Sequence, residues 1–82
     1  MSDKIQELVA SIKSNEAEIS EMSQSIKDYY NDIQVKFTAN NGIRNAEIDQ
    51  VYKKIDSTFN AKAKLETKVR NAKTEILSIM LV

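Results

Sequence analysis

The chain has 82 residues, enough for one domain at most, and contains no cysteine and no histidine. Disulfide bonds, the usual zinc ligands and the catalytic pairs built on these side chains are therefore excluded. Its 12 basic and 12 acidic residues balance, which argues against the strongly basic surface of a nucleic-acid-binding domain. We expect a protein that is not an enzyme, has no cofactor or metal, and binds no nucleic acid or small-molecule substrate.

The two ends of the chain show no secretory or membrane signal. The N-terminal stretch MSDKIQELVASIKSNEAEI carries charges throughout and lacks the continuous apolar core of a signal peptide. The longest nearly apolar run is ILSIMLV at residues 76–82, and a membrane-spanning helix needs roughly 20 such residues. These patterns predict a cytoplasmic protein with no stable membrane insertion.

Residues 3–38 show the heptad pattern of a coiled-coil helix, because large side chains recur at alternating steps of three and four. We name the first position of each pair a and the second d. Every a position is isoleucine, whereas the d positions vary and include one polar residue. The predicted seam consists of Ile5, Ile12, Ile19, Ile26 and Ile33 at a, and of Leu8, Asn15, Met22 and Tyr29 at d.

The heptad slips by one residue near the middle of the chain. The first series predicts a positions at residues 40 and 47, but the second half places them at 41 and 48. The slip falls within Asn40-Asn41-Gly42, which holds the only glycine of a chain without proline. One continuous helix would have to absorb the slip locally, whereas glycine and asparagine both suit a turn, and Asn41 could cap a second helix. We predict a turn at residues 39–42.

Residues 43–80 carry a second seam, which predicts a second helix. Its a positions are Ile48, Ile55, Lys62, Val69 and Ile76, and its d positions are Val51, Thr58, Leu65, Ala72 and Ile79. Tyr52, Phe59 and Met80 widen the apolar stripe on one side, as in the broad face of a globular helix pair. The polar seam residues Asn15 and Lys62 are typical of positions that select register and partner.

The two halves of the chain carry opposite charge. Residues 1–38 hold 4 basic and 7 acidic residues, a net charge of −3, and residues 43–82 hold 8 basic and 5 acidic residues, a net charge of +3. This asymmetry favours the first helix beside the second, although each exposed pair contributes only about 0–1 kcal/mol. It suits a hairpin and equally a dimer of alternating hairpins, so pairing within or between chains stays open.

The C-terminal end is more apolar than one partner helix can cover. Its large side chains point all around the helix and predict a contact with a second hairpin, a different protein or, less favourably, a membrane interface. The outer face of the second helix offers two aromatic residues as a further contact. The predicted partner interface is Leu77, Met80, Leu81 and Val82, together with Tyr52 and Phe59.

The turn and its surroundings resemble a known family. Asn40-Asn41-Gly42 lies near the midpoint, and a small residue, Ala46, and an aromatic residue, Tyr52, follow the glycine. This layout resembles the small WXG-type helical hairpins of type VII secretion and the related helical partners of LXG toxins. Those proteins are cysteine-poor chains of similar size, without a cleavable leader, in which two long helices flank a central turn. Of the family's Trp-x-Gly turn motif, this chain has the glycine.

One further motif belongs to this resemblance. Tyr52 and Asp56 match the family's export signal Tyr-x-x-x-Asp/Glu, here inside the second helix instead of close to its end. The resemblance implies export without a cleavable signal peptide and a targeting role for these two residues. Alternatively, Tyr52 is an aromatic residue that flanks the core, near Tyr29 or Tyr30.

These patterns together predict an all-α protein, an antiparallel two-helix hairpin completed to a four-helix bundle by self-association as a homodimer or by a protein partner. We expect a binding module. The resemblance implies a secretion-associated partner, or chaperone, that binds a helical domain of a larger secreted effector. The alternative is a structural coiled-coil adaptor or assembly subunit with no export role.

Overall fold

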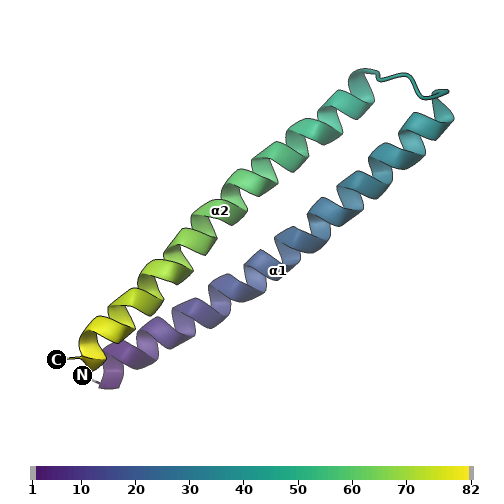
Figure 1. Cartoon of the computed structure of the whole chain (residues 1–82). Helices are drawn as coiled ribbons and strands as arrows, with labels where there is room; N and C mark the ends of the chain where they lie inside the picture. Colours follow the sequence, from purple (N-terminus) through teal and green to yellow (C-terminus); the bar gives the residue numbers. More distant parts are fainter. Residues whose placement is uncertain (1, 82) are drawn as a thin grey trace.

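The protein is an all-α helical hairpin, as the sequence predicts. A computed structural model describes residues 2–81 and contains two helices, α1 (Ser2–Ala39) and α2 (Ala46–Met80). The helices lie side by side and antiparallel, so both ends of the chain lie at the end opposite the turn (Figure 1). The hairpin is long and thin, with principal extents of 61 × 14 × 13 Å.

The heptad seams form the contact between the helices. The buried residues are all seam positions: Leu8, Ile26, Ile33, Ile48, Val51, Ile55, Val69 and Ala72. Every other a or d position is half-buried, including the polar Asn15, Thr58 and Lys62. Both predicted seams are therefore confirmed. They form because burying isoleucine, leucine and valine along one face stabilises two long helices that would each be marginal alone.

The core is concentrated at the turn end of the hairpin. Ile33, Ile48, Val51 and Ile55 form its buried cluster, and Ile48 is completely inaccessible to solvent. Three aromatic rings pack against this cluster from its edges: Tyr29, Phe37 and Tyr52. Toward the termini the seam isoleucines are only half-buried. A hairpin with so thin a core has little stability to spare, because small domains bury a small fraction of their surface.

The end of α1 is a Schellman motif, the hydrogen-bonded cap that closes many helices. Asn41 adopts a left-handed backbone with φ 56°, and Gly42 follows with φ 77°. The Gly42 amide donates to the carbonyl of Phe37 at 2.7 Å, and the Asn41 amide donates to that of Thr38 at 3.4 Å. The predicted turn is confirmed at these residues, because asparagine and glycine are the two residue types that most readily adopt this backbone.

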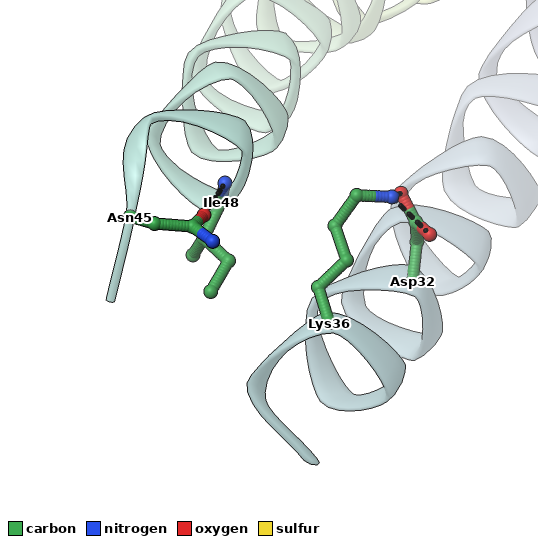
Figure 2. Close-up of polar contacts among 4 residues, drawn as sticks. All are labelled: Asp32, Lys36, Asn45 and Ile48. Atoms are coloured by element: carbon green, nitrogen blue, oxygen red, sulfur yellow. Dashed lines mark hydrogen bonds and ion pairs between the residues drawn. The ribbon is translucent and has the colours of Figure 1, made fainter. Parts of the chain in front are cut away.

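The start of α2 differs from the prediction. The helix begins at Ala46 and not at residue 43, and its N-cap is Asn45 and not Asn41. Asn45 has an extended backbone, with φ −139° and ψ −179°, and its side-chain oxygen accepts a hydrogen bond from the Ile48 amide at 3.0 Å (Figure 2). Asn41 cannot take this role, since its left-handed backbone is already committed to closing α1.

Candidate interaction surfaces

One side of the hairpin is lined by position e, the residue that follows each d position. We name this surface the lateral stripe. Lys73 Nζ lies 4.0 Å from Glu16 Oε1, and both residues occupy position e. The two rows therefore face each other across the hairpin. The stripe consists of Val9, Glu16, Ser23, Tyr30 and Phe37 on α1, and of Tyr52, Phe59, Glu66, Lys73 and Met80 on α2.

The lateral stripe is built in layers. In an antiparallel helix pair, seven residues up one helix match seven residues down the other, so the Glu16–Lys73 pair sets the level of every other layer. Tyr30 is then level with Phe59, and Val9 with Met80. Phe37 and Tyr52 form the layer nearest the turn, and both pack against the same buried cluster. The stripe thus has one apolar layer near the termini, two adjacent charged or polar layers in the middle, and two adjacent apolar layers toward the turn.

Two of the three apolar layers of the stripe, Val9–Met80 and Tyr30–Phe59, are open to solvent. Val9 is 37% exposed, Tyr30 49%, Phe59 44% and Met80 69%. These four make up half of the eight large hydrophobic residues that are exposed in the described chain. Single scattered residues need no explanation, but four on one side of a small protein make this side a candidate interaction surface.

The other side of the hairpin, lined by position g, is polar. Its ion pair joins Lys4 Nζ to Glu75 Oε1 at 3.9 Å. The g positions are Lys4, Ser11, Glu18, Ser25, Asp32 and Ala39 on α1, and Glu47, Lys54, Ala61, Lys68 and Glu75 on α2. Alanine is the largest apolar side chain among them. The contrast between the two sides shows that the apolar residues of the lateral stripe are not an average surface.

The predicted partner interface divides into two surfaces. Tyr52, Phe59 and Met80 belong to the lateral stripe. Leu77 and Leu81, 59% and 85% exposed, lie around the outside of α2 at the terminal end of the hairpin. The prediction for Val82 lies outside the described residues. Sequence reasoning missed the α1 half of the stripe, Val9 and Tyr30, although their spacing of three heptads was a readable signal.

Tyr52 is held in place on the hairpin. It is half-buried against the core cluster, and the Arg44 guanidinium carbon lies 4.4 Å from the centroid of its ring. Arg44 Nε also donates to Asp49 Oδ1. This hydrogen bond, aided by the negative charge of Asp49, raises the pKa of Arg44 above its ordinary value. Tyr52 therefore flanks the core, while Asp56, one turn later, is exposed.

Features of the described residues bear on three kinds of binding, to metal ions, to small molecules and to membranes. Residues 2–81 contain no group of three or more carboxylates, cysteines or histidines placed to hold a metal ion. A shallow depression on the outer surface of α1 is lined by Asn31, Gln34, Val35, Thr38 and Ala39, all from one helix. A ligand there would lack the enclosing walls of a small-molecule site. Within the described chain, neither helix has a stretch long and apolar enough to cross a membrane.

Fold and surfaces together define the class of this protein, a helical hairpin that exposes apolar side chains along one side and at one end. Comparisons of the chain with protein-family models, curated proteins and solved structures find no match.

Proposed function

We propose that the protein is a non-enzymatic binding module that docks a helical segment of a larger protein against the terminal end of α2. The observation that carries this proposal is the exposure of Leu77 and Leu81 at that end. Burying such side chains gains about 1.5–3 kcal/mol each. An amphipathic helix is the partner that fits, because its regularly spaced apolar residues can cover a convex helical end.

In its specific form, the proposal is a role in type VII secretion. The partner is then a helical domain of a secreted effector, and the hairpin completes an export-competent bundle with it. The central turn at Asn41 and Gly42 between two helices of similar length supports this proposal, as does the Tyr52–Asp56 spacing on α2. The protein would then be made in the cytoplasm and exported with its effector, without a cleavable signal peptide.

A second candidate function is a structural adaptor, a coiled-coil subunit of a cytoplasmic assembly. The polar seam residues Asn15 and Lys62 favour it, because such positions select register and partner in coiled coils. The neighbouring genes separate the two candidates. A WXG or LXG protein beside a membrane ATPase supports secretion, and phage structural or cytoskeletal genes support the adaptor.

Binding is tested with the double variant Leu77→Ser/Leu81→Ser. Both side chains are exposed, so we expect the hairpin to keep its helicity. Affinity for the helical segment of the effector encoded next to this protein should fall by at least about tenfold. Val35→Ser is the matched control, since Val35 is 66% exposed on the outer face of α1. Unchanged binding by the double variant would reject this end as the docking surface.

Export is tested separately, in cells that carry the secretion machinery. If Tyr52 and Asp56 form an export signal, Asp56→Ala should abolish secretion of the hairpin and leave its helicity unchanged. Lys53→Ala is the control, because Lys53 is exposed in the same helical turn at a variable position of the motif. Normal secretion of Asp56→Ala would leave the adaptor role as the better proposal.

A further inference from the structure

The lateral stripe exposes apolar residues near the termini, at Val9 and Met80, and toward the turn, at Tyr30 and Phe59, with one charged and one polar layer between them. We propose that it is the interface between two copies of this chain, which pack in parallel, with both turns at the same end, to form a four-helix bundle. This inference adds a second partner to the proposed binding role. It rests on residues other than Leu77 and Leu81, so its failure is distinguishable from failure of effector docking.

In this parallel dimer a two-fold axis runs along the bundle. It places each layer of the stripe opposite the same layer of the second copy. α1 of one copy then lies beside α2 of the second copy. Tyr30 meets Phe59 of the second copy, and Val9 meets Met80 of the second copy. Each exposed apolar residue of the stripe thus meets an apolar residue at the same level. A surface that is complementary to itself is what a two-fold symmetric interface requires.

The charges of the stripe favour the same arrangement. Glu16 lies beside Lys73 within the hairpin, and in the parallel dimer it also faces Lys73 of the second copy. The two pairs form a closed ring of four alternating charges. On a larger scale, acidic α1 lies against basic α2 of the second copy, so the net charges of −3 and +3 are complementary. Complementary potentials across an interface select partner and orientation.

The antiparallel dimer lacks these matches. With the turns at opposite ends and full overlap, the stripe would be centred on Ser23 and Glu66. Tyr30 would then face Glu16 of the second copy, and Phe59 would face Lys73 of the second copy. Each helix would also lie against its own equivalent, acidic against acidic and basic against basic, which costs rather than contributes binding energy.

The size of the surface suits a stable dimer. A face of 61 by 14 Å offers on the order of 800 Å² per copy, the area that each partner contributes in a standard protein–protein interface of about 1,600 Å². The hairpin also has reason to associate, because domains of this size with one thin core usually require a partner or another constraint. A second copy is always available to supply it.

Sedimentation analysis tests the dimer. We expect the wild-type chain to have twice its mass of 9.3 kDa at concentrations of about 50 µM, with Phe59→Glu and Tyr30→Glu each dimerising at least roughly 30-fold more weakly. Val35→Glu introduces the same charge outside the stripe and should leave the dimer intact. Helicity measured in parallel identifies any variant that unfolds. A wild-type monomer, or folded stripe variants that dimerise normally, would overturn the proposal.

Exchange of charges tests the orientation. Glu16→Lys places lysine against lysine across the parallel interface, and Lys73→Glu places glutamate against glutamate. Each variant alone should dimerise about tenfold more weakly, whereas an equimolar mixture should form a one-to-one heterodimer as readily as wild type. Both side chains are more than half exposed, so the fold tolerates these changes. A mixture no better than its components would reject the parallel pairing.

A spin label at Thr38 gives the orientation directly. Thr38 is exposed near the turn, and the chain has no native cysteine, so Thr38→Cys is labelled uniquely. In the parallel dimer the two labels lie across the bundle, below about 35 Å apart. In the antiparallel dimer each Thr38 lies 15 residues from the centre at Ser23, and the two lie on opposite sides of it. Their separation is therefore about 45 Å along the axis. The longer distance would overturn the proposal.

Discussion

The guanidinium of Arg44 lies over the ring of Tyr52, 4.4 Å from its centroid, and joins the segment between the helices to the body of α2. Arg44 also pairs with Asp49, so one side chain holds the connecting segment against the first two turns of the helix. A guanidinium over the face of an aromatic ring is attracted by the ring. We therefore expect Arg44→Ala to lower the free energy of unfolding. Arg44→Lys should recover part of the loss, because lysine keeps the charge without the planar stacking. Equal stability of wild type and Arg44→Ala in chemical denaturation would contradict a structural role for this contact.

The two left-handed residues of the turn predict substitutions of opposite sign. Asn41→Gly should stabilise the hairpin by a few tenths of a kcal/mol, since glycine adopts φ 56° without strain. Gly42→Ala should destabilise it by about 1–2 kcal/mol, through the backbone alone, because a Cβ at Gly42 meets no atom within 4 Å. Thermal unfolding at one fixed protein concentration measures both changes. A stabilising Gly42→Ala would show that the turn has a different backbone.

Asn45 should behave differently from an asparagine inside the same helix. Asn45→Ala removes the hydrogen bond from the cap oxygen to the Ile48 amide and should cost about 1 kcal/mol. Asn60→Ala, at an exposed position in the middle of α2, should instead stabilise the protein by about half a kcal/mol through helix propensity. Denaturant titrations of both variants give the comparison. If both substitutions stabilise, Asn45 is not the cap.

The isoleucine seam should dominate the stability of the fold. Ile26 is 6% exposed, and Ile26→Ala leaves a cavity between the helices that should cost about 2–5 kcal/mol. The neighbouring Lys27 is exposed, so Lys27→Ala should change stability by less than about 0.5 kcal/mol. Thermal unfolding of the two variants under identical conditions measures the difference. Similar melting temperatures would contradict the seam assignment.

Lys36 predicts a change with pH at the turn end. Its ammonium lies 2.8 and 2.9 Å from the two carboxylate oxygens of Asp32 (Figure 2). The hydrogen bond to Asp32 raises the pKa of Lys36, and the negative charges of Asp32 and Glu47 add to it against an opposing effect of burial. A raised pKa in the folded state means that this contribution to stability is complete below the unfolded pKa of about 10.4 and is lost as pH rises through the folded value. Asp32→Asn should lower the pKa of Lys36 in an NMR titration, and Asp28→Asn should not. An unchanged pKa in Asp32→Asn would show that the ion pair does not form in solution.

The sequence by itself determined the helices, the seam and the turn. A repeat of seven residues with isoleucine at every a position of the first half permits only a helix with one apolar face, since successive side chains of a strand alternate between faces. The slip of the heptad at the only glycine predicted a hairpin, because the left-handed backbone that closes α1 is accessible to few residue types. These features depend on local spacing and local conformation, both of which are legible along the chain.

Only the tertiary structure decided which asparagine caps α2 and which side chains share the lateral stripe. Asn41 and Asn45 are both chemically suited to cap α2. Asn45 is the cap because the Schellman motif that ends α1 already holds Asn41 in a left-handed backbone conformation. The composition of the stripe depends on the register between the two helices. The ion pair of Glu16 and Lys73 shows that register. Each helix alone shows apolar residues at position e, but only packing of the two seams places Tyr30 level with Phe59 and joins the two patterns into one stripe.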